Sequence, residues 1–217
     1  MTVAALYVER RGPYFGMPDV DPWDKERDAR LYAGPHPVVA HPPCERWGRY
    51  WSGGPSARAR RRLGDDDGCF AMAVHAVRTW GGVLEHPEAS HAFRIFHLGS
   101  PDHRGEWARS DDRLGWVCCV EQGHYGHAAR KKTWLYACGL DAYDRPGAFT
   151  LPRLIWGPSS GRRLDEGFHS KTERDAARAS GVRPRVRLSS VENALTPPTF
   201  ADILIGIARS VADKRAA

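Results

Sequence analysis

Two short apolar segments of this chain each lead to a side chain that could take part in chemistry. Residues 37–43 begin small and β-branched, end in two prolines, and are followed by the thiol of Cys44. Residues 81–84 are again apolar and lead to the carboxylate of Glu85, with a histidine and a proline after it. Proline has no N–H to donate to a neighbouring strand, so each segment is predicted to be a strand that stops there. We therefore expect Cys44 and Glu85 at the carboxyl ends of two strands, where open α/β sheets bind their ligands.

The cysteines of the chain allow two interpretations of Cys44. A thiolate is an intrinsically strong nucleophile, whereas many free cysteines only fill space in a core. The chain has five cysteines, spaced irregularly and with Cys118 and Cys119 adjacent. An odd count in this pattern favours reduced thiols in a cytoplasm over a disulfide framework.

The elements that must position these groups follow from periodicity and turn signals. Residues 65–80 are predicted to form a crossover helix, because three acidic residues crowd its amino end and apolar residues recur on one face. With the strands on either side it makes a β-α-β unit. Strands are expected at 3–9, 37–40, 81–87, 115–127 and about 133–139, and a last helix at 199–211.

This order of elements predicts an α/β fold with a Rossmann-like, mostly parallel sheet, flanking helices and a β-hairpin at one edge. The hairpin is residues 115–139, with a basic turn at its tip. The N-terminal half is expected to be reduced, since residues 10–36 leave little room beyond a loop and one helical turn at 25–28. We expect a single α/β domain over 1–217, with its core at 1–139, a C-terminal helix at 189–213 and an irregular basic insertion at 140–188.

Charge and hydropathy narrow the choice of partners. The net charge is +6, and basic residues cluster at 57–62, 130–132 and 162–187, which fits either nucleic acid or a solvated surface. No apolar run approaches the roughly 18 residues of a membrane span, and a charged pair interrupts the start where a signal peptide would be apolar. We expect a cytoplasmic protein with no membrane partner; its oligomeric state is not encoded in any recognisable pattern.

The segment after Cys44 is rich in tryptophan, arginine and glycine. Residues 45–54 include Arg46, and such a mixture can stack on bases and meet phosphates. It can equally be a loop that packs on its own tryptophans, and the sequence leaves both open.

Four motifs in order resemble the cytosine-C5 DNA methyltransferases, and in particular small phage-encoded methyltransferase-like proteins. His-Pro-Pro-Cys at 41–44 is similar to the Pro-Cys nucleophile motif, and Glu-His-Pro at 85–87 to the Glu-Asn-Val motif. Residues 122–132 resemble the segment ending in Gln-x-Arg-x-Arg, and residues 192–198 the closing Gly-Asn-Ala-Val-Pro-Pro motif. The resemblance covers about residues 37–139 and 189–211.

The resemblance implies a transferase that modifies C5 of a pyrimidine, most simply cytosine in DNA, through a cysteine adduct at C6. Cys44 would be the nucleophile, Glu85 the partner of the base at N3 and N4, and Arg130 the partner of O2, with Lys132 as its alternative. A free pyrimidine nucleotide is the other substrate form, and a base in a duplex would have to leave its stack. The other expected substrate-binding residues are His41, Arg46 and His86.

The expected cofactor is S-adenosyl-L-methionine, with Glu9, Pro43 and Asn193 as its binding residues. The chain departs from the family here: no Phe-x-Gly-x-Gly loop follows the first strand, and the half that usually holds the cofactor is short. Since the resemblance is to phage-encoded proteins, it implies that the chain acts in the cytoplasm of a host cell.

Two other functions remain open. A catalytically lapsed relative that only binds nucleic acid would keep the basic clusters without the cofactor loop. A metal site would need the histidines at 41, 86, 124 and 127 to converge with Cys44, although the chain has neither C-x-x-C nor H-E-x-x-H.

Overall fold

The computed structural model describes residues 1–49, 51–52, 61–101, 105–139, 151–161, 171–181, 192 and 194–212. Its centre is a seven-stranded sheet in the order β2-β1-β3-β4-β7-β6-β5. The strands are β1 (Val3–Leu6), β2 (Val20–Trp23), β3 (Val38–Ala40), β4 (Gly82–Pro87), β5 (Ala108–Arg109), β6 (Gly115–Glu121) and β7 (Lys132–Cys138). β2, β1, β3 and β4 are parallel, whereas β7, β6 and β5 join by antiparallel pairs. The predicted α/β sheet with a hairpin, β6–β7, is confirmed.

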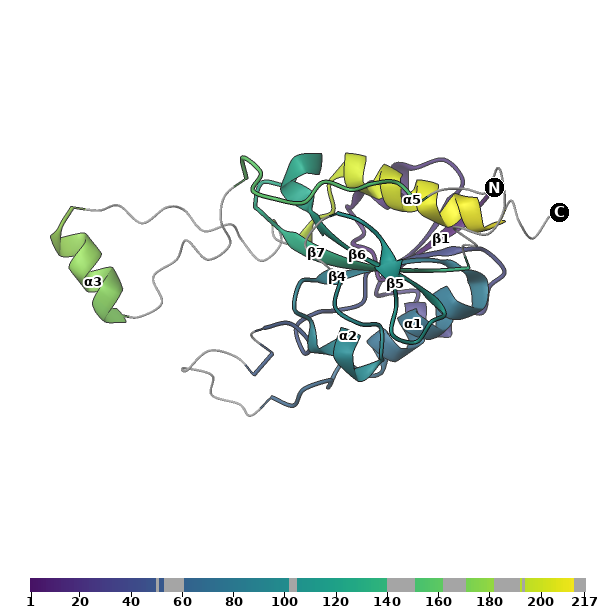
Figure 1. Cartoon of the computed structure of the whole chain (residues 1–217), viewed down its shortest axis with the longest axis horizontal. Helices are drawn as coiled ribbons and strands as arrows, with labels where there is room; N and C mark the ends of the chain where they lie inside the picture. Colours follow the sequence, from purple (N-terminus) through teal and green to yellow (C-terminus); the bar gives the residue numbers. More distant parts are fainter. Residues whose placement is uncertain are drawn as a thin grey trace.

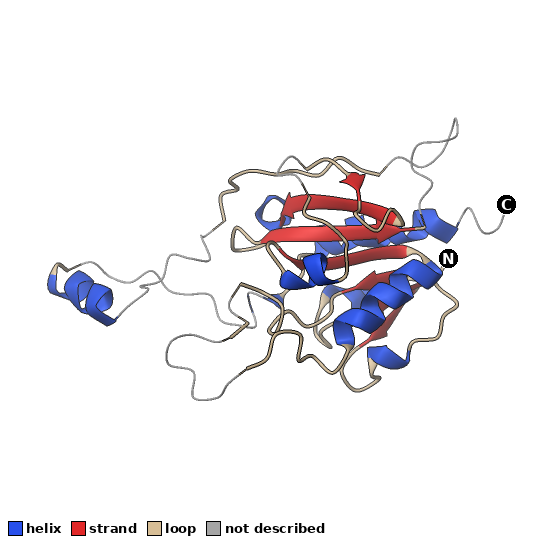
Figure 2. Ribbon diagram, turned by 60° about the horizontal axis from the view of Figure 1, so that its bottom comes forward, coloured by secondary structure: helices blue, strands red, loops and turns tan. Residues whose placement is uncertain are grey.

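Helices cover both faces of this sheet (Figure 1). α5 (Pro198–Ala212) lies on one face, and α1 (Cys69–Trp80) and α2 (His91–Ile95) lie on the other. Figure 2 shows the same layers with the strands in red between the helices. The nine-residue α3 (Lys171–Ala179) is highly polar and lies apart from the sheet in both views. Among the described residues, each helix is too short or too polar to cross a bilayer.

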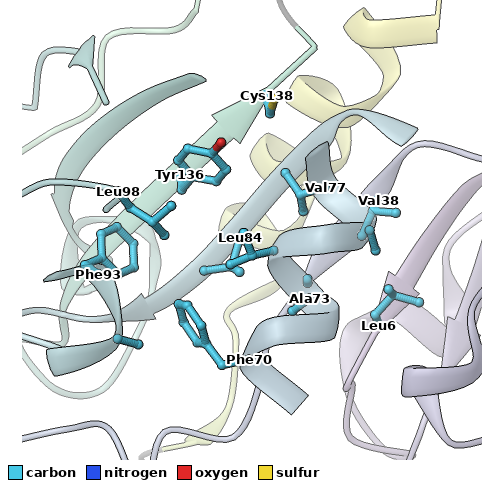
Figure 3. Close-up of a cluster of buried hydrophobic side chains, with 14 of the residues drawn as sticks. Leu6, Val38, Phe70, Ala73, Val77, Leu84, Phe93, Leu98, Tyr136 and Cys138 are labelled. Carbon is cyan, nitrogen blue, oxygen red and sulfur yellow. The ribbon is translucent and has the colours of Figure 1, made fainter. Parts of the chain in front are cut away.

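The central strands divide their side chains between two cores by simple alternation. In β4, Val83 packs toward α5 and Leu84 toward α1, and β1, β3, β6 and β7 alternate in the same way. Figure 3 shows the α1-side core, in which Phe70 and Val77 of α1 meet Leu84 and Tyr136 from the sheet. Strands buried on both faces are typical of a parallel sheet between helices, and this explains why their sequences are almost continuously apolar.

The N-terminal half contains more regular secondary structure than the sequence predicts. Residues 19–32 were predicted to hold only a helical turn, but they contain β2 at the sheet edge and the 3-10 helix η2 (Ala29–Leu31). β2 escapes prediction because it is only partly buried and contains Pro22, which an edge strand tolerates. Between β1 and β2 lies only the 3-10 helix η1 (Pro13–Gly16), so these two parallel strands have no α-helical crossover.

Two further expectations about local structure are wrong. The strand expected to run on through residues 123–127 ends at Glu121, and the 3-10 helix η3 (Gln122–Tyr125) follows it. The insertion at 140–188 is not wholly irregular, because α3 is helical and Leu151 and Leu154 are buried against the α5-side core. The rest of that insertion, residues 140–150 and 162–170 among them, lies outside the described residues.

Candidate functional site

The register of two neighbouring strands brings the predicted groups together. β3 and β4 are parallel, with Ala40 opposite Leu84, so His41 comes next to Glu85 at the carboxyl edge of the sheet. The distance from His41 Nδ1 to Glu85 Oε2 is 3.0 Å. Cys44 follows His41 by three residues, after the two prolines that end β3. The expected meeting of the two strand ends is therefore confirmed.

Glu85 is a buried carboxylate surrounded by donors. Its Oε1 accepts hydrogen bonds from Gln122 Nε2 at 2.9 Å and from the Thr133 hydroxyl at 3.3 Å, and Lys131 Nζ lies 3.9 Å from the same oxygen. Burial by itself would raise the pKa of Glu85, but the Lys131 ammonium and the His41 hydrogen bond outweigh it and lower that pKa to about 2. Glu85 is therefore ionised at neutral pH.

Tyr14 completes this group from η1, in the connection between β1 and β2, where the sequence predicts only a loop. Its hydroxyl lies 2.7 Å from His41 Nε2, and the residue is 2% exposed. Burial, then the nearby charges of Glu85 and Asp202, raises the pKa of Tyr14 well above its usual value. The bonding order of Tyr14, His41 and Glu85 matches that of a nucleophile-histidine-acid triad, but the position next to Nε2 is filled by Tyr14 and not by Cys44.

The loop that carries Cys44 is held by Trp47. The backbone N–H groups of Trp47 and Gly48 donate to the Cys44 carbonyl at 3.0 and 2.8 Å, which closes a tight turn. The Trp47 ring is buried against Phe70, and its Nε1–H donates to Asp66 Oδ2 at 2.7 Å. Asp66 also accepts the N–H of Phe70, so one carboxylate ties the Cys44 loop to the start of α1. Of the two interpretations of residues 45–54, packing on its own tryptophan is confirmed for Trp47.

Cys44 is the exposed member of the five cysteines. Although the residue is exposed, the segments around its sulfur desolvate the thiolate, and this raises the pKa of the thiol. The Glu85 carboxylate raises that pKa further and the Lys131 ammonium opposes it, so both charges lie close enough to act on the sulfur. In the free protein Cys44 is therefore a thiol, and a reaction must remove its proton.

The basic tip of the hairpin contains three cations with different surroundings. Lys131 is the one beside Glu85, whereas Lys132 lies 3.8 Å from Glu88 and stacks over Trp156. Arg130 instead donates from Nε to the Ser159 carbonyl at 2.9 Å. Among the described residues, the basic side chain of the hairpin tip beside Glu85 is therefore Lys131, and not Arg130 or Lys132, which the resemblance implies.

A strap formed by residues 155–161 explains the direction of Arg130. Glu121 donates its N–H to the Ile155 carbonyl at 3.2 Å and accepts the N–H of Ser159 at its side chain, at 2.7 Å. Tyr125 accepts the N–H of Ile155. These bonds clamp the strap across the end of β6, on the side of the hairpin tip where Arg130 emerges.

The remaining expected binding residues are spread over different surroundings. His86 is fully buried on the α1 side against Phe70, and burial lowers its pKa to about 4. The Pro43 carbonyl lies near enough to the His86 ring to favour its charged form, but neither ring nitrogen of His86 makes a hydrogen bond to a described residue. Arg46 is half-buried, and its Nη1 likewise has no hydrogen-bond partner in the part of the chain that the structure describes.

The expected cofactor residues do not form a recognisable cradle. Glu9 and Pro43 are exposed, and Asn193 lies outside the described residues. The turn after β1 is closed by its own backbone, since Gly12 N–H donates to the Glu9 carbonyl, and no α-helix follows to present its amino end. The acids that follow are engaged: Asp24 caps a turn, and Asp21 and Asp28 are paired with arginines. The described residues of this set, Glu9 and Pro43, do not fit S-adenosyl-L-methionine.

Two other features bear on the chemistry available. Gln122, which sequence analysis missed as a site residue, is fully buried and joins Glu85 to Thr133, while its Oε1 makes no hydrogen bond to any described residue. Its position in a Gln-Gly pair at a strand end was the available signal. Among the described residues, no three histidine, cysteine or acidic side chains gather as metal ligands.

Comparison of the chain with models of known protein families and with curated proteins finds no match. The function of this chain is therefore inferred from the residues of the site alone.

Proposed function

We propose that this chain is a transferase that modifies C5 of a pyrimidine, most simply cytosine, in DNA or in a nucleotide. One observation carries the proposal: the buried carboxylate of Glu85 lies 3.0 Å from His41 and 3.9 Å from Lys131, and both Glu85 and Lys131 lie close enough to the exposed Cys44 to act on the pKa of its thiol. A nucleophile, an acid and a cation at one edge of a sheet are the groups that this chemistry needs.

The protonation states suggest how the addition proceeds. The resting pair is a thiol and a carboxylate, so the Cys44 proton passes to Glu85 as the sulfur approaches the ring. The sulfur pair then forms the bond to C6, the C5–C6 π electrons shift toward C4, and N3 takes the proton from Glu85. Lys131, rather than the expected Arg130, is the cation that offsets charge developing on the ring. C5 becomes nucleophilic and takes up a proton from water, whose place the electrophile takes in the transfer reaction. Water then accepts the original C5 hydrogen, the C5–C6 double bond re-forms, and the C6–S bond breaks with its electron pair on sulfur. The N3 proton returns through Glu85 to the sulfur, which restores the pyrimidine and the Cys44 thiol.

Exchange of the C5 hydrogen with solvent tests this without knowledge of the electrophile. A single-stranded oligonucleotide with [5-³H]cytosine, and [5-³H]dCMP in parallel, should release tritium to water with the wild-type protein, with and without S-adenosyl-L-methionine. Cys44→Ser should abolish release, and loss of the acid in Glu85→Gln should slow it by about 10²–10⁴-fold. Cys69→Ser, which changes a half-buried thiol on α1, is the matched control and should keep full activity.

A second candidate is a nucleic-acid-binding protein that has lost the reaction. It is favoured by the raised pKa of the Cys44 thiol and by the engagement of both Glu85 oxygens with other residues of the chain. Under this alternative, oligonucleotide binding is equal in wild type and Cys44→Ser, and no tritium is released by either protein. That combination would refute the transferase.

A further inference from the structure

We infer that Tyr14 and His41 are positioning residues that hold Glu85 as an oriented carboxylate beside Cys44. The inference rests on the proposed function for its catalytic meaning, but its structural content can be tested without a substrate. Tyr14 belongs to none of the four motifs on which the resemblance depends, and the resemblance implies for His41 only a role in binding substrate.

The first step is the tautomer of His41. The neighbours of Glu85 include three donors, Gln122, Thr133 and Lys131, on its Oε1, and a carboxylate can only accept. His41 Nδ1 must therefore carry a hydrogen to bond Glu85 Oε2 at 3.0 Å. In the neutral ring Nε2 is then a lone pair, and it accepts from Tyr14.

The second step is that Tyr14 can only reinforce this tautomer. Its side chain is almost fully buried in the α5-side core, and burial, then the charges of Glu85 and Asp202, raises the pKa of its hydroxyl, so the hydroxyl keeps its hydrogen. A hydroxyl can donate or accept, but among the described residues His41 Nε2, at 2.7 Å, is its hydrogen-bond partner, so that hydrogen is satisfied only when Nε2 of the neutral ring carries a lone pair. Tyr14 thereby commits Nδ1–H to Glu85, although 71 residues separate Tyr14 from Glu85 in sequence and no direct bond joins them.

The third step concerns the proton that the reaction must move. Glu85 has to accept the Cys44 proton and then pass it to the ring, so its free lone pairs need a constant direction. His41 on Oε2 and Gln122 on Oε1 fix the carboxylate plane from two different elements. Without the Tyr14 hydroxyl the Glu85 carboxylate still favours hydrogen on Nδ1, but Nε2 loses its donor and the ring loses one of the two bonds that fix its direction.

Long-range ¹H–¹⁵N NMR of the imidazole rings at pH 7 reads the tautomer directly, with His41 assigned by the signal lost in His41→Asn. We expect wild-type His41 to carry hydrogen on Nδ1, and Tyr14→Phe to keep that tautomer but to change the ¹⁵N shift of Nε2, whose lone pair loses its donor. Tyr32→Phe is the matched control, since this buried tyrosine also loses one hydrogen bond, to the His36 carbonyl, and should leave the His41 signals unchanged. Hydrogen on Nε2 in the wild type, or no response to Tyr14→Phe, would overturn the inference.

The tritium-release assay distinguishes a positioning role of His41 from a purely structural one, because only a positioning role predicts different activities for two replacements of His41. In His41→Asn the amide N–H can replace Nδ1–H, so activity should stay within about tenfold of wild type, whereas His41→Phe should lose about a hundredfold or more. Equal losses in the two variants at equal folded fractions would contradict a positioning role. If the Nδ1–H tautomer and the response of Nε2 to Tyr14→Phe are found but no protein releases tritium, the proposed function fails and the structural inference stands.

Discussion

Replacing Glu85 with glutamine should destabilise the fold strongly, although the change is nearly isosteric. The pKa of Glu85 falls from 4.5 in a model compound to about 2, so ionisation stabilises the folded state at neutral pH. At 1.36 kcal/mol for each pKa unit, this charge contributes about 3 kcal/mol. Glutamine also turns an amide NH₂ toward a donor, either His41 or the Gln122–Thr133 pair. For a chain of this size, about 3 kcal/mol corresponds to a melting temperature lower by roughly 6–12 °C.

Urea denaturation of both proteins across pH checks the magnitude and its origin. Because the pKa is lowered on folding, the contribution is present above pH 4.5 and is lost as pH falls toward 2. The gap between wild type and Glu85→Gln should therefore be full at pH 7 and shrink below pH 4.5. Glu26→Gln is the control, since it breaks an exposed ion pair with Arg10, and exposed pairs contribute about 0–1 kcal/mol. Equal stability of Glu85→Gln and wild type at pH 7 would refute the reasoning.

Three further outcomes follow from the site. His86 is buried with its pKa lowered to about 4, so urea denaturation should show about 3 kcal/mol of stability lost as pH falls from 6.5 toward 4, and His86→Phe should remove this dependence. A pH-independent wild type over that range would contradict the neutral buried ring. Trp47→Phe removes the bond to Asp66 and should cost about 1–3 kcal/mol while speeding iodoacetamide labelling of Cys44, as read by intact mass. Unchanged labelling would mean that Trp47 does not restrain the thiol loop. Lys131→Met removes the charge that lowers the pKa of Cys44 and should slow that labelling at pH 8; faster labelling would count against the assigned coupling.

The proposed site depends on one polar group of atoms on the α5 side of the sheet. His41, Glu85 and Gln122 come from three separate strand ends and share hydrogen bonds, while Tyr14 reaches them from the connection between β1 and β2. Apart from Gln122 Oε1, which no described residue bonds, the buried polar atoms of this group are paired, and such a network specifies how the strand ends meet. Stability and the proposed chemistry therefore use the same contacts.

The sequence by itself determined the parts of the fold that repeat a simple pattern. Apolar runs that end at prolines located β3 and β4, and the helical period located α1 and α5 to within a few residues. Because parallel strands end at one edge, the approach of Cys44 and Glu85 followed from these local signals.

Tertiary structure alone decided which side chains surround Glu85. Tyr14 and Gln122 are brought to the site by contacts over 27 and 37 residues, and no local pattern records such contacts. The choice of Lys131 over its neighbours depends on how the hairpin leaves η3 and enters β7, since side chains alternate between the two faces and a one-residue shift would turn a different cation toward the carboxylate. The sequence identifies the candidate cations, but the register of the hairpin decides which of them faces Glu85.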